Sequence, residues 1–432
     1  MKIPAVKGTR DFYPGEMAKR NFIVDGWKAV SLRNGFEEYD GPIFEYLQLY
    51  QIKSGEEIAE QLFRLTDRGG RDLAIRPEIT PTLARMVNEQ INTLPKPIKW
   101  FSVPRLCRAE RPQKGRLREF FQWNIDVIGV DDVLADAEVI FCGLDYLQYA
   151  GLGAEDMVVK ISSRRLLHAI LTSYGVAEDS MDTVYAVLDK KAKLPTEAFV
   201  ELVNQKISDK AVADKIIAYS NMAAKEVWDT YITPYVSSDN EFSKAAMEMD
   251  KLFEYLRNMN VPAAMYEFDP QIIRGLAYYT GVVFEIYAKG QELRAVAGGG
   301  RYDNLLKLLG GPAISATGLG MGDVVLGIAL EEKGLLKSES LGRKLDYYIG
   351  YTDGQFLPKA IETAADLRRK GFCAEFSYKP AGPGKALKAA SGAGAKKCVI
   401  IAQEFVDRNE LIVKDMATGV QEMVKADTFR NE

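Results

Sequence analysis

Six cations fall within fourteen residues at 105–118, which read Arg-Leu-Cys-Arg-Ala-Glu-Arg-Pro-Gln-Lys-Gly-Arg-Leu-Arg. Arg108 and Glu110 have the same parity, so on a strand both side chains face the same side. An arginine on a strand is a fixed two-pronged donor for a phosphate. The basic loop that follows, with Arg111 and Arg116, suits a triphosphate or the end of a nucleic acid. On the charges alone, a solvated charged hairpin is the better interpretation.

Three further groups of polar residues could contact a ligand. In residues 76–80 (Arg-Pro-Glu-Ile-Thr), a carboxylate between a strand and a helix start can hold an ammonium group, and helix capping is an equal alternative. Residues 274–281 combine an arginine and two tyrosines with glycines that let the backbone approach a ligand. Residues 298–303 (Gly-Gly-Gly-Arg-Tyr-Asp) permit a tight turn or a close approach. Core tyrosines and an ordinary turn are the alternatives for the last two groups.

The element that must position these groups is a strand predicted over residues 119–128. Its apolar residues alternate with Gln122, Asn124 and Asp126, which face the other side. A strand with an apolar back and a polar front, in a chain of this size, suggests a sheet with a binding site on one face. This strand favours the interpretation of the basic segment before it as part of a site. A helix is predicted over residues 80–91, with Thr80 as its cap and Pro81 at its first position.

The 432 residues predict two or three domains. We expect a catalytic core over residues 1–335, interrupted by a charged, mainly helical module at about 165–260. Residues 336–344 read as a linker. In residues 345–432, strands alternate with helices, which indicates a small α/β domain with a largely parallel sheet.

Bulk composition excludes several classes of protein. The net charge of -4 gives no sign of nucleic-acid binding, although a local basic patch remains compatible with it. Four cysteines without Cys-x-x-Cys spacing and a single histidine, His168, argue against a zinc site. No apolar run approaches the roughly 20 residues that a membrane-spanning helix needs, and the N-terminus lacks the apolar core of a signal peptide. We therefore expect a cytoplasmic protein without membrane contact.

The order of these groups resembles the histidyl-tRNA synthetase family, which belongs to the class II aminoacyl-tRNA synthetases. Residues 274–279 and 299–303 resemble the two histidine-specific motifs, which together are highly specific for the family. The other resemblances cover nearly the whole chain. Residues 7–14 resemble the N-terminal signature, Gly41-Pro42 resembles motif 1, and residues 108–126 resemble motif 2. Residues 318–330 occupy the place of motif 3, and residues 345–432 resemble the anticodon-binding domain.

The resemblance implies a fold and a reaction. The fold would be an α+β catalytic domain with an antiparallel sheet, a helical insertion and a C-terminal α/β anticodon-binding domain. The reaction would be the activation of L-histidine with ATP to histidyl-adenylate, followed by transfer to tRNA(His), with Mg²⁺ as the metal. Motif 1 is a dimerisation element in the family, so the resemblance also implies a homodimer.

The resemblance also assigns roles to individual residues. The implied histidine-binding residues are Glu78, Thr80, Gln122, Asp126, Tyr278, Tyr279 and Tyr302. The implied ATP-binding residues are Arg108, Glu110, Arg111, Arg116 and Arg274. Arg108 and Arg274 would be the catalytic pair, on opposite sides of the α-phosphate. Carboxylate attack there builds negative charge on the phosphate oxygens, and two fixed guanidiniums stabilise that charge without rearranging.

The sequence departs from the family pattern at three positions. Motif 3 normally ends in Gly-x-Glu-Arg, and Val325 stands where its arginine would hold the terminal phosphates of ATP. Ala277 replaces the usual aspartate of the first histidine motif, and Asp126 replaces a glutamate. Arg111, Arg116 or a magnesium ion are our candidates for compensating the lost arginine.

Two alternatives belong to other functional classes. One is a regulatory subunit of ATP phosphoribosyltransferase, a paralog that lacks the C-terminal domain. The other is a sensor of histidine or uncharged tRNA with an inactive core, for which the missing motif 3 arginine is the only support. A burst of pyrophosphate with histidine and ATP separates the enzyme from both.

Overall fold

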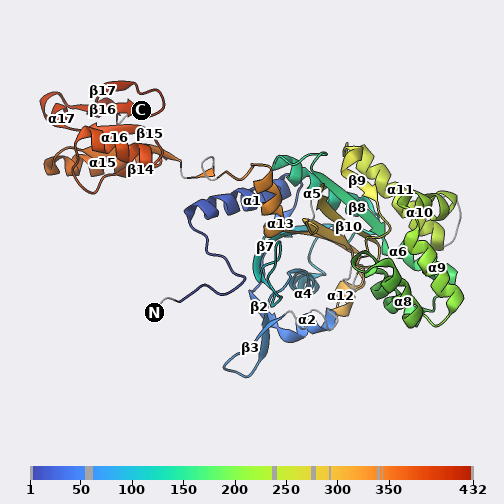
Figure 1. The fold of residues 1–432 in the computed structure, drawn as a ribbon. Coiled ribbons are helices and arrows are strands. Elements are labelled where there is room, and N and C mark those ends of the chain that lie inside the picture. The colour runs from blue at the N-terminus through green and yellow to red at the C-terminus, as the bar shows by residue number, and fades with distance from the viewer. Residues whose placement is uncertain are drawn as a thin grey trace. The chain divides into compact units, whose positions relative to one another are not determined.

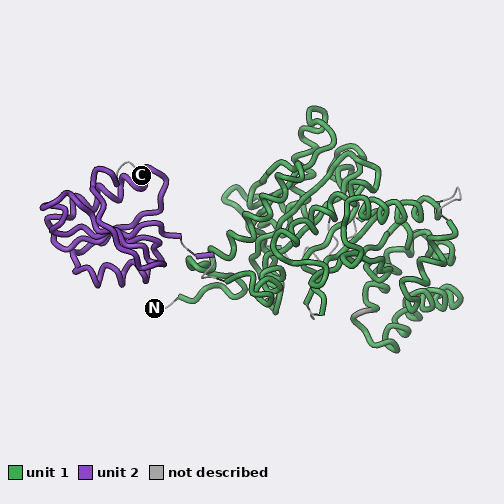
Figure 2. The backbone as a smooth tube through the Cα atoms, turned by 90° about the horizontal axis from the view of Figure 1, so that it is seen from above, with its two compact units in different colours: residues 1–337 green, residues 338–432 purple. Residues whose placement is uncertain are grey.

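The structure, a computed structural model, describes residues 3–53, 62–235, 241–273, 279–290, 293–337, 341–342 and 344–429. The chain divides into two compact units, residues 1–337 and residues 338–432 (Figure 2). Each unit has a sheet and a hydrophobic core of its own. Within the described residues, no helix is both long and apolar enough to cross a membrane.

A nine-stranded sheet forms the centre of the first unit (Figure 1). The strand order is β1-β5-β7-β12-β11-β10-β8-β9, and β6 pairs with β7. The pairs β1/β5 and β8/β9 are parallel and the other pairs are antiparallel, which confirms the predicted antiparallel sheet. The strands are β1 (Glu37–Glu38), β5 (Ile98–Ser102), β6 (Arg105–Cys107), β7 (Glu119–Ile128), β8 (Met157–Ser163), β9 (Tyr266–Phe268), β10 (Val282–Ala288), β11 (Ala297–Arg301) and β12 (Ala316–Gly322).

The apolar side of β7 packs against α1 (Pro14–Arg33) and α5 (Leu134–Tyr149). Trp123 packs against Trp27 and Tyr146, with ring centroids 6.3 and 5.5 Å away. Its indole nitrogen donates a hydrogen bond of 2.8 Å to Ser31. α13 (Asp323–Glu332) also packs on β7 and β12. These aromatic contacts and the bonded indole fix which side of β7 faces the core, so the polar residues of β7 face the other way.

The opposite side of the sheet is covered in part by α4 (Thr80–Gln90) and α12 (Leu305–Leu308). The prediction that Thr80 caps α4 is wrong, because Ile79 occupies the cap position and no side chain bonds there. A small sheet of β2 (Phe44–Tyr46), β4 (Asp72–Ile75) and β3 (Phe63–Thr66) precedes α4 in the chain. The helix α2 (Leu47–Lys53) follows β2 and contacts α4. Ile79, Leu83 and Val87 pack against Ile98 and Ile128 of the large sheet. The carboxylate group at residue 78 is thereby held at the edge of a packed core.

A helical module connects β8 to β9 (Figure 1). Its α-helices are α6 (Arg164–Tyr174), α7 (Met181–Leu188), α8 (Thr196–Lys206), α9 (Lys210–Asn221), α10 (Ala224–Tyr231) and α11 (Glu241–Asn258). α11 packs on α5 and α6, which attaches the module to the sheet's helical layer. His168 lies here, with Nδ1 3.1 Å from the hydroxyl of Tyr185 and Nε2 3.4 Å from Glu178. These contacts account for His168 as a structural side chain.

The second unit has a five-stranded sheet in the order β14-β13-β15-β16-β17. The elements are β13 (Leu345–Tyr351), α15 (Leu357–Arg369), β14 (Ala374–Phe376), α16 (Pro383–Gly392), β15 (Ala395–Ile401), α17 (Gln403–Arg408), β16 (Glu410–Asp415), β17 (Gln421–Lys425) and α18 (Ala426–Phe429). The prediction of a largely parallel sheet is wrong, because β15/β16 and β16/β17 are antiparallel. The six-residue α17 is too short for the crossover that a parallel neighbour requires.

Candidate functional site

The polar side of β7 places three side chains in a row next to β12. Asn124 and Asp126 are buried, and Gln122 is half-buried. The hydroxyl of Tyr302 donates a hydrogen bond to the Asp126 carboxylate. A buried carboxylate is costly unless it is bonded, so the tyrosine stabilises this group in its position.

Beside these residues the sheet carries a strip without side chains. Gly298 and Gly300 of β11 pair with Gly320 and Gly318 of β12. All four lie on the same side of the sheet as the polar residues of β7, and together they form the glycine strip. A Cβ added at Gly318 would lie 2.2 Å from the Asp126 carboxylate, and one at Gly320 would lie 2.8 Å from the Gln122 amide. The glycines are therefore required by the close approach of the β7 side chains. From sequence alone the glycine runs were only weak evidence of a site.

Two of the predicted tyrosines lie around this glycine strip. Tyr302 and Tyr279 are both buried in the cluster that α4 and α12 form with the sheet. A ring carbon of Tyr279 would lie 3.1 Å from a Cβ on Gly300. Two of the three tyrosines that the resemblance assigns to histidine binding therefore lie near the glycine strip. The third tyrosine, Tyr278, lies outside the described residues, as do Arg274 and Ala277.

Tyr39 is a candidate site residue that sequence reasoning missed. It is buried in the same cluster, and its hydroxyl has no hydrogen-bond partner among the described residues. Burial raises the pKa of this hydroxyl well above its usual value, and the negative charge of Asp126 adds to the shift. A tyrosine at the end of a short strand carries no sequence signal for this role, because only the fold brings it near Asp126.

The group at residues 76–80 divides between structural and site residues. Arg76 is buried and bonds to Asp40 at 2.6 Å and to the Gly41 carbonyl at 2.8 Å, which makes it structural. Glu78 is buried. Arg108 donates from Nε to the Pro77 carbonyl at 3.0 Å, so it lies next to the Glu78 turn. The structure therefore brings the predicted ammonium-binding and phosphate-binding residues together.

The basic loop after β6 is a tight turn. Gln113 and Arg116 bond to each other through their backbones, and Gly115 between them has a φ of 76°. The guanidinium of Arg116 forms an ion pair with Glu110. Arg111 is exposed. Of the ATP-binding residues expected here, Glu110 and Arg116 are therefore each other's partners in this structure.

The first turn of α13 contacts this loop. Val325 is buried, and its Cγ2 lies 3.3 Å from a Cβ added at Gly115. Asp323 binds Arg10 at 2.6 Å and accepts the Phe121 backbone N–H at 2.9 Å. The position of the missing motif 3 arginine is therefore adjacent to the basic loop.

Arg301 lies next to Tyr302 in sequence and points away from the site. It forms a buried ion pair with Asp136 and donates to the carbonyls of Val130 and Asp132, both at 2.9 Å. Both members of the pair are buried. In the Gly-Gly-Gly-Arg-Tyr-Asp segment, the arginine therefore holds β11 onto α5, while the tyrosine bonds to Asp126 in the candidate site.

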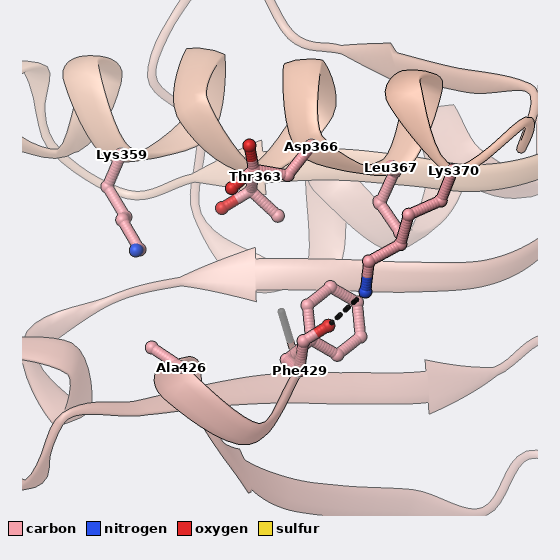
Figure 3. A pocket seen from close by; sticks show the side chains of 7 residues that line it. All are labelled: Lys359, Thr363, Asp366, Leu367, Lys370, Ala426 and Phe429. Carbon is pink, nitrogen blue, oxygen red and sulfur yellow. Dashed lines mark hydrogen bonds between the residues drawn. The ribbon is translucent and has the colours of Figure 1, made fainter. Parts of the chain in front are cut away.

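Among the described residues, neither a metal cluster nor the cavity in Figure 3 marks another site. The described residues contain no group of three or more metal-ligating side chains. Figure 3 shows a small cavity of about 10 Å³ in the second unit, lined by Lys359, Thr363, Asp366, Leu367, Lys370, Ala426 and Phe429. This volume holds about one water molecule and excludes an amino acid or a nucleotide.

Comparisons with known proteins agree with this geometry. Residues 8–322 match the family model described as histidyl-tRNA synthetase, and residues 335–432 match the anticodon binding domain. The chain is 36% identical to a histidine–tRNA ligase of Opitutus terrae, over 96% of this chain and 94% of that protein. It is 34% identical to the histidine–tRNA ligase of Pyrococcus furiosus, over 98% of this chain and 97% of that protein.

The fold likewise matches solved structures. The crystal structure of histidyl-tRNA synthetase from Nostoc sp. PCC 7120 aligns with 100% of this chain and 99% of its own, with a TM-score of 0.82 at 22% identity. At that identity the match concerns the fold alone. The family model and the full-length relatives carry the assignment: the chain belongs to the histidyl-tRNA synthetase family.

Proposed function

We propose that the chain activates L-histidine with ATP and loads it onto tRNA(His), and that the glycine strip beside β7 is its histidine site. The function rests on family membership over nearly the full length. The single observation that carries the site is the buried Asp126 carboxylate, bonded to Tyr302 and bordered by glycines. The regulatory paralog lacks a C-terminal domain, whereas residues 335–432 of this chain match one, so nothing favours that alternative.

Selection of histidine follows from the chemistry of its ring. The imidazole has an N–H donor and a nitrogen acceptor. A buried carboxylate accepts from the N–H, and the neighbouring hydroxyl, whose single proton is bonded to that carboxylate here, would have to turn away from it to donate to the other nitrogen. Asp126 and Tyr302 supply this pair, with Tyr278 and Tyr279 as the proposed walls. Glu78 and Thr80 are the proposed ligands of the substrate's ammonium group, and Gln122 is proposed to line the pocket beside Asp126. An apolar amino acid would leave the buried polar groups unpaired, which a site of this kind rejects strongly.

For ATP, we assign the α-phosphate to Arg108 and Arg274. Arg108 is held by the Pro77 carbonyl and lies with its guanidinium 5.1 Å from the centroid of the Phe120 ring. A guanidinium fixed in this way can stabilise charge that develops on the phosphate without reorganising. Glu110, Arg111 and Arg116 are the proposed contacts to the rest of the nucleotide.

The described residues offer no dedicated cage for Mg²⁺. Magnesium in nucleotide sites is held largely by the phosphates, with one or two carboxylates, so an all-protein site is not required. Glu110 is the proposed carboxylate near the triphosphate. The metal would neutralise phosphate charge, and the positioning of ATP is assigned to the arginines.

The remaining partners are proposals from the family. The second unit would bind the anticodon of tRNA(His), in agreement with its family-model match. Motif 1, around Gly41-Pro42, would form a homodimer. The cytoplasm is the proposed location.

The decisive experiment is ATP–pyrophosphate exchange with the purified chain and each of the twenty amino acids in turn. Exchange with histidine alone is the expected result. Exchange with no amino acid, together with retained histidine binding, would move the sensor and regulatory alternatives to the front. An Asp126→Asn variant should raise the histidine KM of the exchange and leave the ATP KM unchanged, because the carboxylate contacts only the amino acid.

The compensation for Val325 has a separate test. Arg111→Ala and Arg116→Ala should each be assayed for the steady-state ATP KM. A raised KM in either variant supports a phosphate contact from the basic loop, and no rise in both removes the loop from the explanation.

A further inference from the structure

The position of Val325 raises the question of which cation takes over the triphosphate tail. Val325 lies against Gly115 of the basic loop, with 3.3 Å between its Cγ2 and an added Cβ. An apolar side chain offers no donor to a phosphate, so the cation must come from another element that ends at the same place. A tail of several negative charges placed there without a fixed cation would be held only by solvent and metal.

The segment that leads into β11 ends at this place. The Val296 carbonyl accepts the Gly322 backbone N–H at 3.3 Å, and Gly322 is the last residue before α13. In the neighbouring strand Gly322 is in register with Gln122, near the start of β7, where the basic loop ends. Arg294 lies two residues before Val296. It therefore emerges from the sheet at the end where α13 begins and the basic loop returns.

Arg294 has an unusual electrostatic environment for an exposed arginine. The positive charge of Arg116 and the negative charge of Glu110 both act on it. Its pKa is lowered, first by partial burial and then by the charge of Arg116. Two guanidiniums near one another repel, and an anion between them removes the repulsion.

The two arginines differ in their present partners. Arg116 is already in an ion pair with Glu110, so a phosphate would have to replace that carboxylate. Arg294 forms no hydrogen bond or ion pair with the parts of the chain that the structure describes. A guanidinium without a partner among the described residues, next to one that is already paired, is the group that an incoming polyanion meets first.

We propose that Arg294, from the segment before β11, binds the terminal phosphates of ATP in place of the arginine that motif 3 lacks at Val325. The inference rests on the proposed function and deepens it by naming a phosphate-binding residue outside the family's motifs. Arg294 would approach the tail from the β11 side, and Arg116 from the basic loop. The α-phosphate stays with Arg108.

Equilibrium binding of magnesium-ATP and of AMP to the full chain tests the proposal without requiring activity. A residue that holds the terminal phosphates contributes to ATP binding and not to AMP binding. Arg294→Ala should weaken ATP binding by about 10-fold to 100-fold, the range of a lost hydrogen bond to a charged group, and leave AMP unchanged. Arg294→Lys should lose less, because it keeps the charge and loses the fork.

Arg257→Ala is the matched control, because Arg257 is an exposed arginine in the last turn of α11. It should change neither ligand. Equal weakening of ATP and AMP by Arg294→Ala, or no change in either, would overturn the proposal. Exchange assays separate a failure of the Arg294 assignment from a failure of the proposed function. If the wild type exchanges with histidine but Arg294→Ala keeps the wild-type preference for ATP over AMP, only the Arg294 assignment is refuted. Absence of exchange in the wild type refutes the proposed function, while the binding ratio still decides on Arg294.

Discussion

The two sheets of the chain differ in what they bury. In the first unit, buried charged residues are part of the core, and they include Arg76, Glu78, Asp126, Asp136, Arg301 and Asp323. In the described part of the second unit, Thr363 is the one buried polar side chain. Its two apolar clusters occupy the two faces of the sheet, with α15 on one and α16 on the other.

This difference follows from where each unit must recognise its ligand. Burying a charge costs free energy unless it is paired, so buried charges are kept where their orientation is needed. A small polar amino acid has to be enclosed. The buried carboxylates Glu78 and Asp126 do so in the proposed site, while Asp136 and Asp323 are paired with arginines of the fold. A nucleic-acid loop is recognised from outside by splayed bases, and a unit with an ordinary apolar core can present that surface.

The strongest test of the comparison removes a buried charge from the first unit. Arg301→Met should lower its free energy of unfolding by about 3–5 kcal/mol, because Asp136 is left buried without its partner. The double variant Arg301→Met with Asp136→Leu should lose less, since no charge remains buried. All four tryptophans (Trp27, Trp100, Trp123 and Trp228) lie in the first unit, so denaturation followed by tryptophan fluorescence measures this unit.

Thiol labelling separates the two units in the same sample. Cys142 in α5 and Cys398 in β15 are both buried, one in each unit. In Arg301→Met, Cys142 should become reactive at lower denaturant concentration while Cys398 stays as in the wild type. Equal shifts for both thiols would mean that the units unfold together, and the comparison would then not describe stability.

The second test concerns catalysis by a charge at the edge of the first core. Arg108→Ala should reduce the histidine-dependent exchange rate by about 10²–10³, which corresponds to about 2.7–4 kcal/mol of lost transition-state stabilisation. Arg105→Ala is the matched control, because this exposed arginine of β6 is paired with Glu119 at 3.4 Å. Similar losses in both variants, or a loss explained by lower tryptophan-monitored stability, would speak against a direct contact of Arg108 with the phosphate.

The sequence predicts the elements of both units well because their periodicities are local. The strand over residues 119–128 has the same bounds in the structure, and its alternation correctly separated Trp123 from Asp126. The antiparallel direction of β16 was missed because it depends on whether the connection from β15 is long enough to cross over the sheet. The short α17 decides this, and its length is not visible as a pattern in the strands themselves.

Within the site, motif residues were predictable and non-motif residues were not. Asp126, Tyr302 and Arg108 stand in recognisable segments, and the structure brings Asp126 and Tyr302 into contact. Tyr39 and Arg294 stand in segments without such a signal. The pairing of β1 with β5 places Tyr39 near Asp126, and the pairing of β11 with β12 underlies the proposal for Arg294, so single-sequence reasoning had no means of finding either.

A third, smaller effect is expected on the surface of the second unit. Tyr378 is 83% exposed, its ring centroid lies 5.3 Å from that of Phe376, and Lys379 follows it. An exposed ring beside a cation is a platform for a nucleic-acid base, worth about 1–3 kcal/mol by alanine substitution. Tyr378→Ala should raise the tRNA KM of aminoacylation and leave histidine-dependent exchange unchanged. Val406→Ala, an exposed apolar truncation in α17, is the control that should change neither assay.

The smallest expected effect is a pH dependence of opposite sign at two aspartates, one in each unit. In the second unit, hydrogen bonds from the Lys396 ammonium at 2.8 Å and the Cys373 N–H at 2.9 Å lower the pKa of Asp346. The folded unit therefore binds a proton at Asp346 more weakly than the unfolded chain does. This contribution is complete above the ordinary aspartate value and is lost as the pH falls through the lowered pKa. In the first unit, burial raises the pKa of Asp323 against the opposing charge of Arg10, so acid acts there in the other direction.

Labelling of Cys398 at fixed denaturant, with a disulfide reagent that reacts in acid, measures the second unit at each pH. Burial raises the pKa of this thiol to about 11, so its protection reports unfolding of β15 and not thiol ionisation. Asp346→Asn should be less stable than the wild type at pH 7, and the difference should shrink below about pH 4, where the unfolded chain takes up the proton first and the folded carboxylate follows at its lowered pKa. A difference that stays constant with pH would assign the loss to packing of the amide. The acid sensitivity of the second unit would then reside in other exposed carboxylates, of which Asp415, whose pKa is lowered by the Thr418 backbone N–H, is the next to replace.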